Sequence, residues 1–325
     1  MGETRALCVV MACAALCGCA TSSPPAREVA MVAEAFGALH AASQPLLDDL
    51  AVAERAQGQT VALERALQAR AGTQPGPCGG IPYQGDTDEH GNPSGPGVIA
   101  GFCSGDAPYY SPISDPPATG AFRRALRSVG DYTQLLVILA DGSNIDAAQA
   151  QLHTLAANLG SALASAGSMT GAPAAGVGPA LSGLVAAVEP LTRRVATRNN
   201  LDELRRVVLQ ESPKVETVIT ALRDSAPVLF DTVTERSMAR LSGVGLDNAE
   251  VAAAEIARIE AYRATVSIYV VLLDQYRELL HELVAVYHTP QQPLTLAVLA
   301  QRSAELSAGA DAWRRTIANL RAALR

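Results

Sequence analysis

The stretch Asn248–His288 reads NAEVAAAEIARIEAYRATVSIYVVLLDQYRELLHELVAVYH, and it decides the fold. Its larger apolar residues recur at alternating spacings of three and four. That spacing is typical of a long α-helix packed against other helices. We call this set the apolar seam, and it comprises Ile259, Tyr262, Val266, Tyr269, Leu273, Tyr276, Leu280, Leu283 and Tyr287. At 1.5 Å per residue the helix would be roughly 60 Å long, and we expect the rest of the chain to pack around it.

A second stretch with the same spacing follows the turn Thr289–Pro293 and runs to the C-terminus. Two long helices joined by a short turn lie antiparallel. Counting outward from the turn places Trp313 opposite Val266, so we predict that Trp313 packs among Tyr262, Val266 and Tyr269. The tyrosines of the seam would then bury their rings in the core, which we favour over a ligand-stacking groove.

Helical spacing also covers most of the remaining chain. The sequence therefore predicts an all-α fold, an elongated antiparallel helical bundle with long, kinked helices. We expect Pro45 to kink the first helix or to start a new segment, Ser212-Pro213 to open a later helix, and Pro227 to kink that one. The expected helices are Val29–Arg70, Phe122–Ala140, Ser143 or Asn144 to about Ala166, Ala180–Gln210, and the stretch from Ser212 to about Gly243.

A Gly/Pro-rich segment, residues 72–118, interrupts the helical pattern. It holds ten of the 26 glycines and nine of the 19 prolines. A loop of this length is usually functional or disordered. Because Cys78 and Cys103 form an even pair, we predict a disulfide between them that holds the loop. Its apolar residues, among them Tyr109 and Tyr110, would dock on the bundle or contact a partner.

The N-terminus carries a processing signal. Arg5 precedes a short apolar run, Ala6–Ala15, and Leu16-Cys17-Gly18-Cys19 follows it. This arrangement resembles the precursor of a bacterial lipoprotein over about the first 27 residues. The resemblance implies cleavage before Cys19 and lipidation of that cysteine. Since Ala20 stands where the class has Asp for inner-membrane retention, it also implies an outer-membrane lipoprotein, facing the periplasm or the cell surface.

These features divide the chain into three parts: a signal peptide (residues 1–18), a lipidated tether (19–28) and one helical domain (29–325) with the loop insertion 72–118. The net charge of −7 disfavours nucleic acid as a partner. No later stretch reaches 18 uninterrupted apolar residues, so we do not expect a second membrane span.

One set of polar residues on the organising helix resembles a metal site. Asp274, Glu278 and His281 lie on one stripe, and Glu278 and His281 have the Glu-x-x-His spacing of di-metal carboxylate bundles. Those bundles use the pair twice, and this chain has it once. As a zinc-protease motif it also fails, because Ala285 stands where the second histidine belongs. We therefore expect a solvated stripe with no metal or cofactor, and a metal-dependent enzyme centred on Glu278 and His281 remains an alternative.

Residues 147–188 contain no Asp, Glu, Lys or Arg, and their centre is built from small residues. A helical hairpin with closely approaching helices explains this composition. A tip that inserts into a bilayer or another protein is the alternative.

The sequence thus favours a non-enzymatic envelope lipoprotein that presents its bundle or its loop to another envelope protein or a peptide. The membrane itself is the second partner, through the lipid on Cys19. Two alternatives stand beside this function: binding of a small apolar ligand or lipid in a groove between helices, and membrane activity of the uncharged hairpin 147–188.

Overall fold

The computed structural model describes residues 26–70, 103–141, 145–167, 182, 185–186, 201–244, 248–288 and 293–323. The described residues form helices and contain no strand, which confirms the all-α fold class. The main helices are α2 (Ala26–Arg70), α4 (Pro117–Asp141), α5 (Ile145–Gly167), α7 (Leu201–Asp224), α8 (Ala226–Val244), α9 (Ala249–His288) and α10 (Pro293–Ala323). Two short elements, the 3₁₀ helix η1 (Ser104–Asp106) and α3 (Ala107–Tyr110), precede α4.

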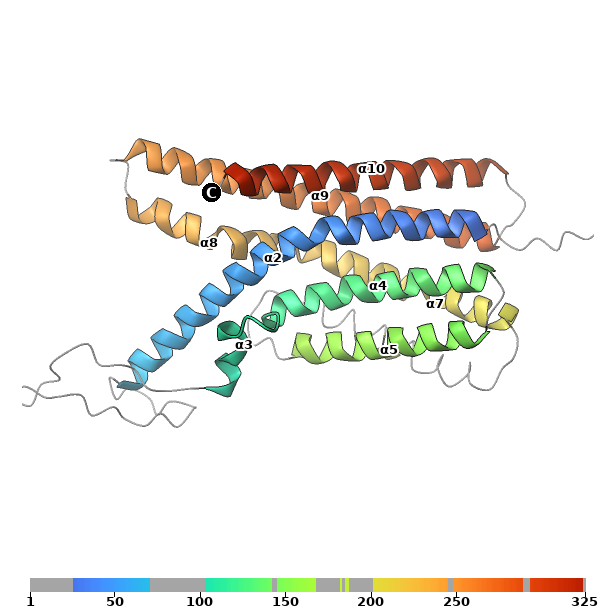
Figure 1. The fold of residues 1–325 in the computed structure, drawn as a ribbon, viewed down its shortest axis with the longest axis horizontal. Coiled ribbons are helices and arrows are strands. Elements are labelled where there is room, and N and C mark those ends of the chain that lie inside the picture. The colour runs from blue at the N-terminus through green and yellow to red at the C-terminus, as the bar shows by residue number, and fades with distance from the viewer. Residues whose placement is uncertain are drawn as a thin grey trace, which may run out of the picture.

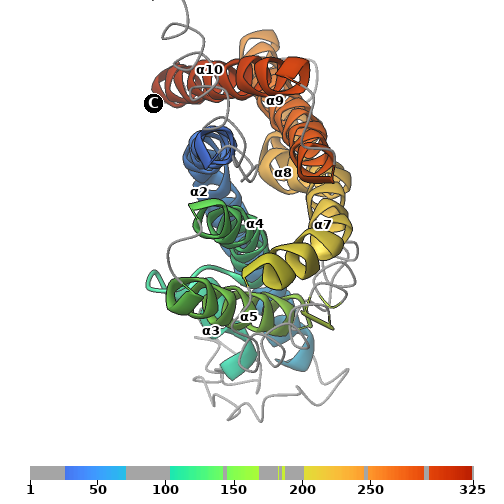
Figure 2. The same cartoon turned by 90° about the vertical axis from the view of Figure 1, so that its right-hand side faces the viewer.

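The helices pack in two layers, and this arrangement buries their apolar faces against each other. One layer contains α10, α2, α4 and α5 side by side, and the other contains α9, α8 and α7 (Figures 1 and 2). Cross-layer contacts join α9 to α2 and α10, α8 to α2, and α7 to α4. Most neighbours are antiparallel, but α2 and α10 both begin at the same end of the molecule and run parallel (Figure 1).

Helix α9 begins and ends almost where its sequence pattern predicts. The side-chain oxygen of Asn248 accepts a hydrogen bond from the N–H of Val251 at 3.3 Å, so Asn248 caps the helix. Trp313 of α10 is fully buried, and its ring stacks on that of Tyr269 with centroids 5.7 Å apart. The predicted pairing of α9 with the C-terminal helix is therefore confirmed.

The apolar seam has more partners than the C-terminal helix. The ring of Tyr276 contacts that of Phe36 of α2, with centroids 4.6 Å apart. Its hydroxyl lies 2.6 Å from the hydroxyl of Thr133 of α4, and Thr133 donates to the carbonyl of Val129 at 2.8 Å. A threonine hydroxyl has one proton, so Tyr276 is the donor to Thr133. The seam thus lies between both layers, and its tyrosines belong to the core.

Two tyrosines of the seam provide a matched test of buried hydroxyls. Tyr276→Phe removes the bond to Thr133 and should lower the free energy of unfolding by about 1 kcal/mol. Tyr269 is equally buried, but its hydroxyl has no hydrogen-bonding partner among the described residues. Tyr269→Phe should therefore leave stability unchanged or raise it, as measured by urea unfolding followed by circular dichroism. An equal loss in both variants would contradict the assigned bond.

The interior prolines have the expected effect on helix geometry at Pro45 but not at Pro213. Helix α2 continues through Pro45 and bends partway along its length (Figure 1), as a kink predicts. The expected start of a helix at Ser212-Pro213 is wrong, because α7 runs continuously from Leu201 to Asp224. Pro213 lacks the N–H that would bond the carbonyl of Leu209. The hydroxyl of Ser212 donates to that carbonyl at 2.8 Å instead, so the helix continues.

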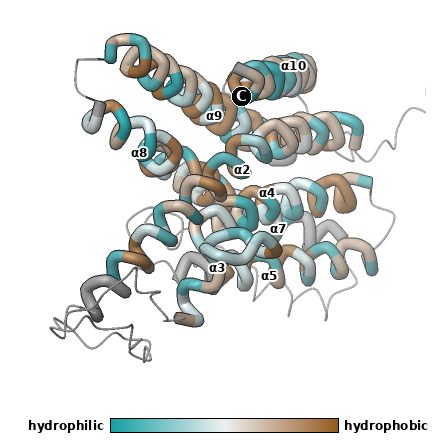
Figure 3. Tube along the Cα trace, turned by 60° about the vertical axis from the view of Figure 1, so that its left-hand side comes forward, coloured by the Kyte–Doolittle hydropathy of each residue, from teal (hydrophilic) through white to brown (hydrophobic). Residues whose placement is uncertain are grey.

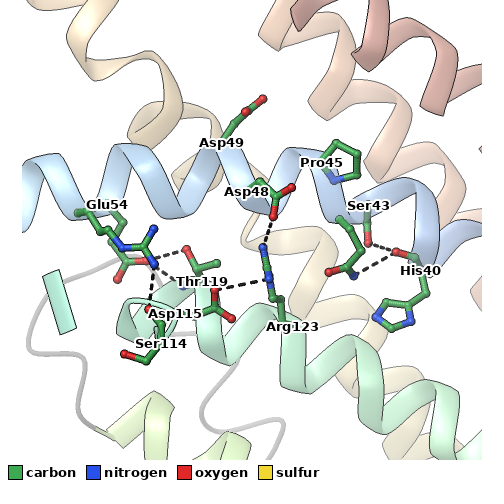
Figure 4. A network of polar contacts seen from close by, with 12 residues as sticks. His40, Ser43, Pro45, Asp48, Asp49, Glu54, Ser114, Asp115, Thr119 and Arg123 are labelled. Atoms are coloured by element: carbon green, nitrogen blue, oxygen red, sulfur yellow. Dashed lines mark hydrogen bonds and ion pairs between the residues drawn. The ribbon is translucent and has the colours of Figure 1, made fainter. Parts of the chain in front are cut away.

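Part of the expected loop 72–118 is ordered against α2. Glu54 is only 7% exposed, and its carboxylate accepts hydrogen bonds from the N–H groups of Ala118 and Thr119, both at 2.8 Å, and from the Thr119 hydroxyl at 2.9 Å (Figure 4). A carboxylate from another helix therefore caps the N-terminus of α4, where both the free N–H groups and the helix dipole favour negative charge.

Residues 103–116 follow the second half of α2. Arg55 donates to the carbonyl of Ser114 at 2.9 Å, and Gln59 donates to that of Tyr109 at 2.8 Å. The ring of Tyr109 lies directly on Gly58, where any Cβ would collide with it. This end of the loop docks on the bundle and forms the short helices η1 and α3, whereas the sequence suggested no helical structure there. Cys78 lies outside the described residues, so the Cys78–Cys103 disulfide stays a prediction.

The two layers separate at one end of the molecule. At that end, α8 and the first half of α9 form one arm, which we call the α8–α9 hairpin. The second half of α2 forms the other arm, and the two arms diverge (Figure 3). Most of the exposed large apolar side chains lie on these arms: Val52, Val61, Leu63, Tyr110 and Ile113 on α2 and the segment docked on it, and Met238, Val251 and Ile256 on the hairpin.

Candidate functional site

The polar stripe suggested by the sequence does not assemble into a site. Asp274 pairs with Arg223 of α7 at 3.0 Å, and Glu278 lies 3.5 Å from Arg302 of α10. His281 is largely exposed, with its nearest carboxylate, that of Glu216, at 3.7 Å. Asp274 and His281 thus lie next to different residues of α7, and Glu278 lies next to α10. Within the described part of the chain, no group of three or more His, Cys, Asp or Glu residues could hold a metal ion.

A groove beside the apolar seam of α9 is the better candidate. It is an open depression of about 820 Å³ between the α7–α8 junction and α9, and we call it the α8–α9 groove. Its floor and walls are mainly apolar, and charged residues mark both ends. It is lined by Arg223, Asp224, Ala226, Pro227, Phe230, Arg263, Val266, Ser267, Val270, Val271 and Asp274.

The break between α7 and α8 forms one wall of the groove. Pro227 has no N–H to donate to the carbonyl of Arg223, and a single turn residue, Ser225, separates the two helices. The sequence-based kink at Pro227 is confirmed in this form. Pro227 is exposed and is the second residue of α8. A missing N–H group costs little at that position, so the break between the helices is well tolerated.

Helix α9 forms the opposite wall of the groove through a second set of residues that share one face of the helix. Arg263, Val266, Val270 and Asp274 repeat at spacings of three and four, so they share one face. Val271 beside them is 53% exposed, an unusual position for a large aliphatic side chain in the middle of a packed helix. The wall thus presents apolar surface to solvent at Val270 and Val271, between the charged residues Arg263 and Asp274.

The ends of the groove carry balanced charges. At one end Arg263 pairs with Glu260 at 3.1 Å, and its guanidinium lies over the ring of Phe230, 5.1 Å from the centroid. At the other end Arg223 donates to Asp224 at 2.7 Å and to Asp274 at 3.0 Å. These hydrogen bonds raise the pKa of Arg223, and the bond to Asp224 has the largest effect. Arg223 therefore stays charged. The groove is therefore suited to an apolar ligand with polar ends.

The tyrosines of the seam do not open into this groove. Tyr269 and Tyr276 are fully buried on the side of α9 that faces α2, α4 and α10. Tyr262 is partly buried and hydrogen-bonds to Asp49 of α2, and burial together with that carboxylate raises its pKa to about 12. All three are therefore structural residues.

The other predicted site residues lie at the edges of the described chain. Cys19, the expected lipidation site, lies outside it, as does most of the uncharged hairpin 147–188 beyond α5. Cys103 is described, and Arg65 of α2 reaches its sulfur at 3.9 Å while binding Asp106 through both carboxylate oxygens. None of the described helices combines the length and apolar character needed to cross a bilayer.

Comparison with protein-family models, curated proteins and solved structures gives no match.

The α8–α9 groove was not predicted from the sequence, although the residue pattern of one of its walls is visible there. The stripe Arg263–Asp274 has the same spacing as the apolar seam and shares Val266 with it, and the seam was the stronger pattern. Which of the two stripes would be covered depends on the position of α7 and α8, and the sequence of α9 does not contain that information.

Proposed function

We propose that this protein is a non-enzymatic, outer-membrane-anchored lipoprotein that binds a partner in the cell envelope through its helical body or its disulfide loop. The observation that carries the proposal is the sequence Leu16-Cys17-Gly18-Cys19 behind a short apolar segment. The fold supports it, because helix α2 begins at Ala26, leaving six residues between the lipidated cysteine and the folded body.

Replacing Cys19 by serine tests the anchor. Cys19→Ser should move the protein from the membrane fraction to the soluble fraction and abolish labelling by a radioactive fatty acid, because the acyl chains provide the membrane affinity. Cys17→Ser is the matched control: it keeps a small residue in the processing motif and should leave both readouts unchanged. A Cys19→Ser protein that stays membrane-bound would rule out lipid anchoring.

The interaction role is tested by photo-crosslinking in intact cells, with a crosslinking amino acid at the exposed Ile113 of the docked segment or at Met238 of the α8–α9 hairpin. A specific adduct with one envelope protein supports the proposal. Self-adducts only, or none at either position, would contradict it for these surfaces.

A second candidate function is binding of a small apolar ligand or an acyl chain in the α8–α9 groove, which the exposed apolar wall favours. The neutral dye N-phenyl-1-naphthylamine should bind the purified soluble form and gain fluorescence. Val271→Glu should weaken that binding at least tenfold, because it places a charge on the apolar wall.

Val298→Glu provides the control for this test. Val298 is also an exposed valine on a long helix, but it lies on α10 outside the groove. Equal dye binding by the two variants would contradict a ligand site in the groove.

A further inference from the structure

The end of the molecule that carries the tether is defined by the packing of α2 on α9. Phe36 contacts Tyr276, and Asp49 hydrogen-bonds Tyr262, so α2 runs antiparallel to α9. Ala26 therefore lies near the last turns of α9. The end of α9 and the start of α10 lie at this same end of the molecule (Figure 1), and we call it the anchor end.

The tether is short compared with the helices. Six residues separate Cys19 from Ala26, and seven steps of at most about 3.6 Å reach about 25 Å. Helix α9 has 40 residues and spans about 60 Å at 1.5 Å per residue. A lipid on Cys19 thus holds the anchor end near the bilayer, while the α8–α9 hairpin begins about 60 Å away along the same body.

Ion pairs and a hydrogen bond hold the two helices of the hairpin together. Glu255 of α9 is buried and bonds Arg240 of α8 at 3.1 Å, Arg258 at 3.1 Å and the hydroxyl of Ser237. The bonds to Arg240 and Ser237 join α9 to α8 within three turns of the end of α8 and the start of α9. Separating the two helices would leave the buried carboxylate of Glu255 without its partners on α8, which is costly, so we expect the two helices to stay packed as one arm.

The charge of the chain opposes a flat orientation on the membrane. The net charge is −7 and stays −7 after loss of residues 1–18, which contain one acid, Glu3, and one base, Arg5. A leaflet with anionic lipids repels such a body, and this repulsion grows with the area brought close to the surface.

We infer that the protein stands on the bilayer with its anchor end toward the lipid headgroups and holds the α8–α9 hairpin as a membrane-distal arm. This orientation rests on the proposed lipidation of Cys19. It places the exposed Met238, Val251 and Ile256, together with the second half of α2, beyond the reach of the bilayer.

Energy transfer to the lipid surface tests the orientation. Ala285→Cys and Ala253→Cys place a donor dye at two exposed alanines of α9 that lie 32 residues, or about 48 Å, apart. Since 32 residues complete about nine turns, both dyes project from nearly the same face. The lipidated full chain is reconstituted in phosphatidylethanolamine–phosphatidylglycerol vesicles that contain an acceptor-labelled lipid.

We expect several-fold greater transfer from position 285 than from position 253. Equal transfer from both positions, or greater transfer from 253, would overturn the upright orientation while the protein still floats with the vesicles. The Cys19→Ser variants with the same labels should neither float nor transfer. If the lipidated protein itself does not float with vesicles, the lipid anchor is wrong, and the orientation falls with it.

Discussion

Replacing Trp313 by alanine should lower the free energy of unfolding by about 3–5 kcal/mol, the range for truncating a large, buried aromatic residue. The indole is fully buried between α10 and α9 and stacks on Tyr269, which is itself fully buried. A close-packed interior relaxes only partly around the lost volume, so a cavity would remain beside the central helix. Urea unfolding followed by circular dichroism measures the effect.

Trp313→Phe is the control for this experiment, because it keeps an aromatic ring on Tyr269 and should cost clearly less than alanine. Trp313 is the only tryptophan of the chain, so the native protein should show the blue-shifted emission of a buried indole. An emission maximum typical of exposed tryptophan in the folded protein would contradict the packing of α10 on α9.

Replacing Glu54 by alanine should lower the free energy of unfolding by about 3 kcal/mol. The substitution removes a charged acceptor and leaves buried hydrogen-bond donors without a partner. The two N–H groups and the hydroxyl that bond Glu54 belong to Ala118 and Thr119 at the start of α4. Their release should loosen the first turn of α4 and, with it, the docked segment 103–116. Urea unfolding gives the energy, and faster hydrogen exchange at the amides of residues 118 and 119 locates it.

Glu64→Ala is the matched control, because Glu64 is an exposed glutamate on the same helix. Its effect should stay within about 0.5 kcal/mol, as for most surface substitutions. If Glu54→Ala and Glu64→Ala destabilise equally, the carboxylate of Glu54 does not cap α4.

The long helices were predictable because their spacing is a local property. Helix α9 begins within one residue of its sequence-based limit, and α5 follows the stop at Asp141-Gly142 as expected. The wrong prediction of a helix start at Ser212-Pro213 also has a local cause. Ser212 can cap a new helix or replace the missing donor within an existing one, and the surrounding packing decides between these roles.

The polar contacts between distant segments were not predictable. Arg321 of α10 binds Asp49 of α2 at 2.6 Å, and Arg123 of α4 binds the neighbouring Asp48 at 2.5 Å. In the sequence these residues look like ordinary surface charges. Only the side-by-side packing of α10, α2 and α4 brings them together, and it also determines that α2 and α10 run parallel.

The sequence by itself determined that Asn248–His288 is a long helix, that most of its seam is buried, and that Trp313 packs on the seam at Tyr269, because side-chain spacing along a helix fixes which residues share a face. It did not determine what covers each face. The tertiary structure placed α2, α4 and α10 over the seam and left the stripe Arg263–Asp274 as one wall of an open groove. The physical reason is that burial depends on the relative positions of helices that lie far apart in the chain, and periodicity within one helix carries no record of them.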